Sequence, residues 1–167
     1  ELPSSPTNIQ ADNVLSVAAT VGYDVIAPFS NYGVLNVDVA APGVSINSAV
    51  PGDEYLPVSG TSQAAPYVAN IAGKIKDANP KLTPVQIKQI VIESVDLRED
   101  LKNLVKSGGI VNGSRAIKAA ELSLSYDLKE AISLSREMIE DQERSRDKTI
   151  LNGISLGVLP LPSTFSL

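Results

Sequence analysis

The 167-residue chain contains no cysteine and no histidine, and aromatic residues make up only 4% of it. Without cysteine, disulfide bonds, thiolate metal sites and a cysteine nucleophile are all excluded. Without histidine, the chain lacks the side chain that most often acts as a general base near neutral pH. If the protein performs chemistry that requires an imidazole, this sequence does not supply it.

Long apolar runs and a dominant charge are also missing. No uninterrupted apolar stretch approaches the roughly 20 residues that span a bilayer, so no membrane span is predicted. The net charge is −5, with acidic and basic residues interspersed, which argues against nucleic acid as a partner. The first residues lack the basic and apolar regions of a signal peptide. The hydrophobic fraction of 43% indicates a globular protein with a sizeable core.

The most informative stretch is residues 60–66, which read Gly-Thr-Ser-Gln-Ala-Ala-Pro. Small and apolar residues continue from there to Ile75 at the spacing of a buried helix. Ser62 is therefore expected at the N-terminus of a helix, where unpaired N–H groups and the helix dipole stabilise an anion. One interpretation is a helix merely capped by Ser62; the other is a serine nucleophile whose intermediate is stabilised there.

The pattern Gly-Thr-Ser-x-Ala-Ala-Pro resembles the nucleophile motif of the subtilisin-like serine proteases, or subtilases. The resemblance implies that Ser62 is the catalytic nucleophile and that its backbone N–H forms part of the oxyanion hole. Gly60, Thr61, Ala64 and Pro66 support the motif. Family members usually carry histidine after this proline, where the present chain has Tyr67. Since that histidine is not the catalytic base, the difference does not alter the implied role of Ser62.

Further segments follow the order of the C-terminal part of a subtilase catalytic domain. They include a Val-Ala-Ala-Thr strand, Phe-Ser-Asn-x-Gly, Asp-x-Ala-Ala-Pro-Gly, a helix beginning at Thr83-Pro84, and a closing Gly-Gly-x-x-Asn segment. The resemblance covers roughly residues 2–122. Within it, a short buried strand is predicted at residues 14–20, and a second strand at residues 37–46 is predicted to be broken by Pro-Gly and then resumed.

Two acidic positions could be mistaken for sites. Asp38 is the only carboxylate in an apolar run, but the triad aspartate of subtilases lies much nearer the N-terminus, so a hydrogen-bonded structural role is favoured. Asp53 and Glu54 lie in a Pro-Gly turn and are interpreted as a solvated loop, because calcium sites need more oxygen ligands. No cofactor or metal motif is identifiable, although a structural calcium ion is left open.

The predicted fold class is α/β, as a three-layer subtilisin-like fold with a mainly parallel sheet, of which this chain supplies the C-terminal portion only. Residues 1–122 are assigned to the catalytic domain and residues 123–167 to a C-terminal extension. The extension begins with an amphipathic helix reaching about residue 148, which could continue the helix that starts near Arg115. An extended apolar tail follows; packing, occupation of the substrate cleft or partner docking, and membrane docking are its alternative roles.

A subtilase site also needs an aspartate, a histidine and an oxyanion-hole asparagine, which in the family lie N-terminal to these segments. The resemblance therefore implies a serine endopeptidase acting on protein or peptide substrates. This chain would be one fragment of a nicked or autoprocessed zymogen, paired with an N-terminal fragment that carries those residues. A secreted or extracytoplasmic location rests on the resemblance alone. The alternative is an inactive pseudoprotease that serves as a binding or regulatory module.

Overall fold

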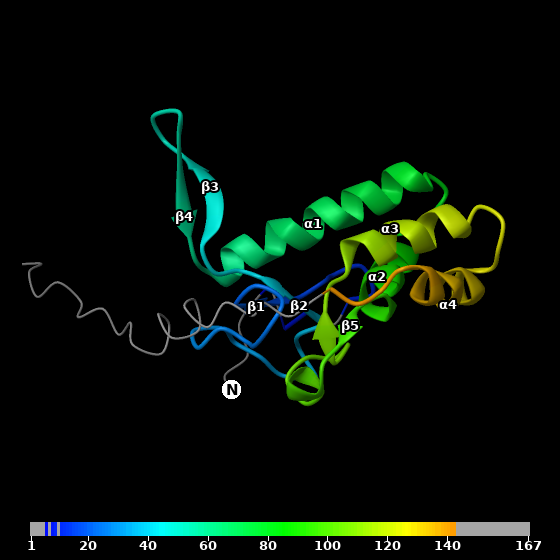
Figure 1. Cartoon of the computed structure of the whole chain (residues 1–167), viewed down its shortest axis with the longest axis horizontal. Helices are drawn as coiled ribbons and strands as arrows, with labels where there is room; N and C mark the ends of the chain where they lie inside the picture. The colour runs from blue at the N-terminus through cyan, green and yellow to red at the C-terminus, as the bar shows by residue number, and fades with distance from the viewer. Residues whose placement is uncertain (1–5, 7, 10, 143–167) are drawn as a thin grey trace, which may run out of the picture.

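The computed structural model describes residues 6, 8, 9 and 11–142 of the chain (Figure 1). Its main sheet has the strand order β1-β2-β6-β5. The strands β1 (Val17–Thr20), β2 (Val39–Pro42) and β6 (Gly109–Ile110) run parallel, and β5 (Asp96–Leu97) pairs antiparallel with β6. A mainly parallel sheet within a mixed α/β chain was predicted, and the structure confirms it.

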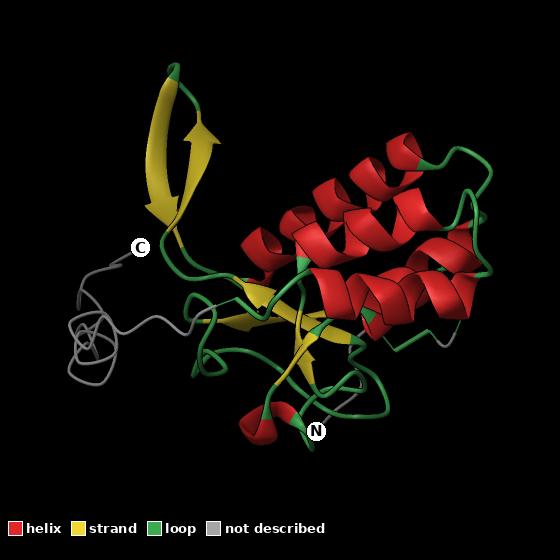
Figure 2. Cartoon of the chain, turned by 45° about the vertical axis from the view of Figure 1, so that its right-hand side comes forward, coloured by secondary structure: helices red, strands yellow, loops and turns green. Residues whose placement is uncertain are grey.

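Helices cover one face of this sheet, as Figure 2 shows. The helices are α1 (Thr61–Ala78), α2 (Pro84–Glu93), α3 (Gly113–Leu122) and α4 (Leu128–Met138). Alternate residues of the strands point to opposite faces. Thus Ala19, Val39 and Ala41 pack in the same core as the helices. Ala18 and Ala40 instead pack against Leu101 of the short 3₁₀ helix η1 (Glu99–Leu101), on the other side.

Short polar side chains begin three of the four helices. The predicted start of α2 at Thr83 is confirmed, because Thr83 and Gln86 form a reciprocal capping box and Pro84 occupies the first turn. Asn112 accepts a hydrogen bond from Arg115 N–H at the start of α3, and Asp127 accepts one from Glu130 N–H at the start of α4. These caps fix where the helices of the main layer begin.

The prediction that the extension continues the helix starting near Arg115 is wrong. Helix α3 ends at Leu122, where the N–H groups of Ser125 and Tyr126 both bond to its carbonyl, and α4 restarts after the Asp127 cap. The predicted amphipathic character holds, since α4 buries Ala131, Ile132 and Ser135. The helix was predicted to reach about residue 148, but α4 ends at Met138, where Ile139 is extended and residues 139–142 are not helical. Residues 143–167, which include the predicted apolar tail, lie outside the described residues. The domain boundary at residue 122 stays a prediction.

A second, two-stranded sheet projects from the body of the molecule (Figures 1 and 2). Its strands β3 (Ile46–Val50) and β4 (Glu54–Val58) are antiparallel, with Val50 opposite Glu54. The predicted break between β2 and its continuation occurs at Gly43. At the tip, Gly52 and Asp53 adopt positive φ angles of 96° and 56°. Asp53 and Glu54 are exposed, and among residues 11–142 no cluster of three acidic side chains could hold a metal ion.

Candidate active site

Ser62 is the second residue of α1 and its side chain is exposed. The N–H groups of Gln63 and Ala64 both donate to the carbonyl of Gly60, at 3.1 and 3.3 Å. The N–H of Ser62 has no intrahelical acceptor, because it belongs to the first turn. In the part of the chain that the structure describes, no other group accepts from it either. The Ser62 hydroxyl and N–H therefore both lie at the positive end of a helix of 18 residues.

Close packing between two glycines holds the turn that leads into α1. Gly60 N–H donates to the carbonyl of Gly43 at 2.8 Å, and Gly43 N–H donates to the carbonyl of Thr20 at 2.9 Å. A Cβ atom at Gly43 would lie 2.7 Å from Ala19 Cβ and 2.8 Å from Gly60 O. No side chain fits there without movement of the backbone. The end of β1, the end of β2 and the start of α1 are thus fixed to one another directly behind Ser62.

Pro66 lies inside α1, four residues after Ser62. Proline has no N–H, so the carbonyl of Ser62 loses its intrahelical donor. A helix normally tolerates proline only in its first turn, and Pro66 is beyond that position. Neither backbone polar group of Ser62 therefore takes part in a regular i to i+4 hydrogen bond of α1.

Tyr67 occupies the position of the family's histidine and fixes the next turn of α1. Its hydroxyl forms a short hydrogen bond with the hydroxyl of Tyr23, which lies in the loop after β1. Burial, followed by the bond and charge of Tyr67, raises the pKa of Tyr23 well above its usual range. The bond ties the first half of α1 to the strand end that Gly43 also contacts. Tyr67 is therefore a second support for the position of Ser62.

Asp38 makes its contacts away from the turn at Ser62. Its carboxylate is buried, accepts a hydrogen bond from Ser16 N–H at 2.9 Å and pairs with Lys88 at 3.1 Å. Lys106 lies at 4.0 Å on the other oxygen. The carboxylate joins the residue before β1 to α2 and to the loop before β6, in keeping with the structural role that was favoured for it. No imidazole exists in the sequence for it to orient.

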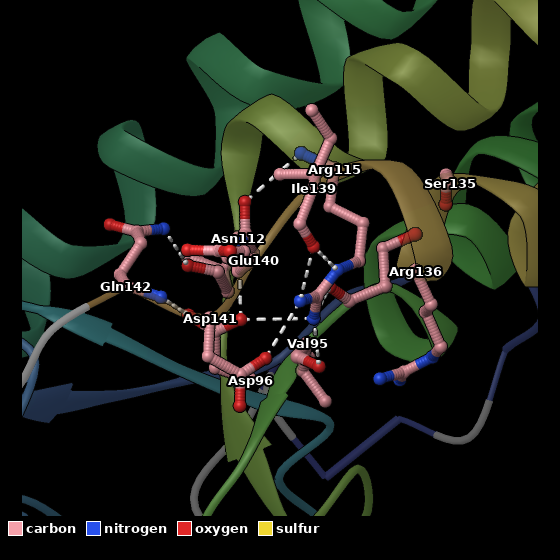
Figure 3. A network of polar contacts seen from close by, with 12 residues as sticks. Val95, Asp96, Asn112, Arg115, Ser135, Arg136, Ile139, Glu140, Asp141 and Gln142 are labelled. Carbon is pink, nitrogen blue, oxygen red and sulfur yellow. Dashed lines mark hydrogen bonds and ion pairs between the residues drawn. The ribbon is translucent and has the colours of Figure 1, made fainter.

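Sequence reasoning missed one polar cluster, centred on Arg115 (Figure 3). The side chains of Arg115 and Asp96 are 3% and 0% exposed, and their nearest atoms are 2.9 Å apart. Asp141, from beyond α4, pairs with the same guanidinium at 2.7 Å. The available signal was an arginine on the face of α3 that also buries Ala116, Ala119 and Ala120. A cation at such a position requires a buried partner.

A mainly parallel sheet covered by helices, with a Gly-Thr-Ser turn at the start of a buried helix, is typical of part of a subtilisin-like domain. Solved structures of subtilisin-like proteins have a similar fold. One described as proteases from Pseudoalteromonas arctica is 34% identical, has a TM-score of 0.54, and is matched over 70% of this chain and 38% of that one. A subtilase cytotoxin assembly shares the fold, with a TM-score of 0.62 at 24% identity, over 81% of this chain and 45% of that one. The family model described as the subtilase family matches residues 3–119, and the chain belongs to that family.

Curated relatives cover the same region. Alkaline elastase YaB from a Bacillus strain is 37% identical over 107 residues, which is 64% of this chain and 27% of the relative. Subtilisin BL from Lederbergia lenta is 38% identical over 109 residues, which is 64% of this chain and 36% of the relative. The chain thus matches about a quarter to a third of the length of these proteases. No helix among the described residues is both long and apolar enough to cross a membrane.

Proposed function

We propose that this chain carries the nucleophile of a serine endopeptidase and that Ser62 is that nucleophile. The observation that carries the proposal is the exposed hydroxyl of Ser62 at the start of α1, next to its own uncommitted N–H group. The same residues form the Gly-Thr-Ser motif within the region matched by the subtilase family. Gly60, Thr61, Ala64 and Pro66 act as support for this turn.

In this mechanism the Ser62 hydroxyl attacks the carbonyl carbon of a peptide bond and gives its proton to an imidazole. The carbonyl oxygen becomes an oxyanion, to which the Ser62 N–H donates at the positive end of α1. Collapse of the intermediate breaks the C–N bond, and the imidazolium protonates the leaving amine. Water then attacks the acyl-enzyme, returns the hydroxyl to Ser62 and releases the acid.

The imidazole, the aspartate that orients it and the second oxyanion donor come from outside this sequence, which has no histidine. We assign them to an N-terminal portion of the same protease. Whether that portion is joined to this chain or separated from it by nicking or autoprocessing is a question for intact-mass analysis of the native protein. A single mass near 17.6 kDa with no copurifying polypeptide would contradict the proposal.

The decisive experiment compares Ser62→Ala with Ser48→Ala in the native protein. Ser48 is a suitable control because it lies in the hairpin rather than at the start of α1, and among residues 11–142 its hydroxyl bonds to Ile46 O alone. Ser62→Ala should abolish labelling by a fluorophosphonate and reduce peptide hydrolysis by at least about a thousandfold. Ser48→Ala should retain both. Labelling that survives Ser62→Ala would reject the assignment.

The second candidate is a pseudoprotease that keeps the subtilase scaffold for binding or regulation. The absence of histidine from this sequence favours it, because it leaves the nucleophile without a base of its own. The sequence of the N-terminal portion distinguishes the two candidate functions. If that portion lacks either the histidine or the aspartate, Ser62 has no activated hydroxyl, and the native protein should be inert to fluorophosphonate before any mutation.

A further inference from the structure

The chain beyond the family's boundary is bound back onto the domain by a short segment. The family model ends at residue 119, yet residues 139–142, here called the C-terminal strap, lie against Arg115 and the β5 strand (Figure 3). Arg115 donates to the carbonyl of Ile139 at 2.8 Å and to the carboxylate of Asp141 at 2.7 Å. The same guanidinium donates to Val95 O and Asp96 on the opposite side. One buried side chain thus joins α3, β5 and the strap.

Asp96 and Asn112 complete the attachment. The N–H of Gln142 donates to Asp96 Oδ2 at 3.0 Å, and Asn112 Nδ2 donates to Asp96 Oδ1 at 2.8 Å and to the carbonyl of Glu140 at 3.2 Å. Arg98 donates to the carbonyl of Gln142 at 2.8 Å. Each of the four strap residues therefore makes at least one hydrogen bond to a side chain of the core. Such repeated binding of main-chain groups resembles the recognition of a docked peptide.

Apart from the strap, helix α4 packs mainly against α3, with Leu128 at its start reaching the main core. Only Ala131 and Ile132 are its buried apolar side chains, and much of its surface is solvated, including Met138. At its C-terminal end, Arg136 donates to the carbonyl of Glu93, the last residue of α2. The strap follows directly after this turn. Its contacts with Arg115 therefore hold the end of α4 that apolar packing does not.

We propose that the strap fastens α4 to the subtilase core through Arg115, so that α4 and the strap open together as one unit while β1, β2 and α1 stay folded. The inference does not depend on the proteolytic role of Ser62. Gln142 also lines a groove shared with Tyr67 and Lys74 of α1.

The charge balance of the cluster shows which contact is the weakest. Asp96 is fully buried, whereas the Asp141 side chain is 54% exposed. Burial pushes the pKa of Asp141 up, but the hydrogen bond and positive charge of Arg115 outweigh this, and the pKa lies below its ordinary value. Arg98 also faces Asp141 and lowers its pKa, and Arg136 stands near both acids. Asp141 is the partner that can be removed without leaving a buried charge alone.

The test is hydrogen–deuterium exchange on the native protein with Asp141→Asn, using Glu121→Gln as the matched control. Glu121 pairs with Lys118 on the exposed face of α3, the helix that carries Arg115. Its replacement therefore removes an acidic side chain without changing any contact of the strap. Asp141→Asn should accelerate exchange across residues 128–142 by about three- to tenfold, given the strength of charged hydrogen bonds and the partial exposure. Exchange in β1, β2 and α1 should not change, and Glu121→Gln should alter neither region.

A second variant, Arg115→Met with Asp96→Asn, removes both buried charges together and so avoids an unpaired one. It should accelerate exchange over the same residues by more than Asp141→Asn does. Two results would overturn the proposal. Acceleration confined to residues 139–142 would show that the strap does not hold α4, and equal acceleration in β1 and β2 would show that α4 is not a separate unit.

Discussion

The polar groups at the start of α1 and those of the Arg115 cluster differ in how many of their hydrogen bonds are made within the protein. Ser62 is exposed, and its N–H and hydroxyl have no partner among the described residues. Arg115 is buried, and its guanidinium is bonded to carbonyls and carboxylates on both sides. The first arrangement keeps donors available for a ligand, at little benefit to stability. The second uses every donor for stability and leaves none for chemistry. Polar residues held ready for chemistry and those that maintain the fold can therefore be separated by their partners.

The largest predicted effect is that of Arg115→Met on stability. It leaves Asp96 as an unpaired buried charge and should lower the free energy of unfolding by about 3–5 kcal/mol. Burial already raises the pKa of Asp96, and loss of the guanidinium raises it further. Because a raised folded pKa favours the protonated acid, the destabilisation should grow as pH rises from about 4, the ordinary pKa of aspartate, to about 7. Denaturant unfolding at both pH values measures this.

Lys118→Met is the control for Arg115→Met, because it removes a cation from the same helix. The pair of Lys118 with Glu121 is solvent-exposed on both sides, so its loss should cost at most about 1 kcal/mol. If the two variants proved equally destabilised, the distinction between the buried cluster and an ordinary surface pair would be lost.

The next largest effect on stability is expected for Gly43→Ala, which disturbs the close contact of Gly43 with Gly60 behind Ser62. The added Cβ would lie within 2.8 Å of Gly60 O and within 2.7 Å of Ala19 Cβ, and overpacking of this kind costs about 1–3 kcal/mol. Gly73→Ala is the control, since nothing lies within 4 Å of its Cβ, and it should stabilise α1 by about 0.5–1 kcal/mol. Thermal unfolding of both variants gives the comparison. A stable Gly43→Ala variant would contradict the close contact of the two glycines.

Tyr23→Phe should produce a smaller effect that depends on pH. It removes the hydrogen bond to Tyr67, at a cost of about 1 kcal/mol near neutral pH. In the native protein the folded pKa of Tyr23 lies above its unfolded value because of burial and Tyr67. The resulting stability is present below about pH 10 and is lost as pH rises further. The free energy of unfolding, measured from pH 8 to 11, should therefore fall less steeply in Tyr23→Phe than in the native protein.

The smallest predicted change is the effect of Ser62→Ala on stability. The side chain is exposed and makes no hydrogen bond within the described residues, so the free energy of unfolding should change by no more than about 0.5 kcal/mol. Together with the loss of labelling, this would separate function from fold at one position. The N-cap of α1 is Gly60 and not Ser62, so a loss of about 1–2 kcal/mol, the usual cost of removing a cap, would contradict the absence of a stabilising bond from the Ser62 side chain.

Local patterns in the sequence were enough to place the helix after Ser62, the Thr83 cap and the break of the second strand at Pro42-Gly43. Each depends on neighbouring residues, whose geometry is set by backbone chemistry. The break between α3 and α4 was missed because apolar spacing continues across it, while the Asp127 cap interrupts the hydrogen bonds. The Arg115 cluster was missed for a different reason. Its partners Asp96 and Asp141 lie 19 and 26 residues away in the chain, and only the fold brings them together.

The projecting β3–β4 hairpin has a practical consequence. Its tip at Gly52 and Asp53 is exposed and uses positive φ angles, and its strands form a ladder separate from the main sheet. A short epitope or a fluorescent label inserted there would extend into solvent without disturbing the buried layers. Since β4 leads through Ser59 and Gly60 into α1, the length of the hairpin would keep such a label away from Ser62, so that the protein could be marked without covering that turn.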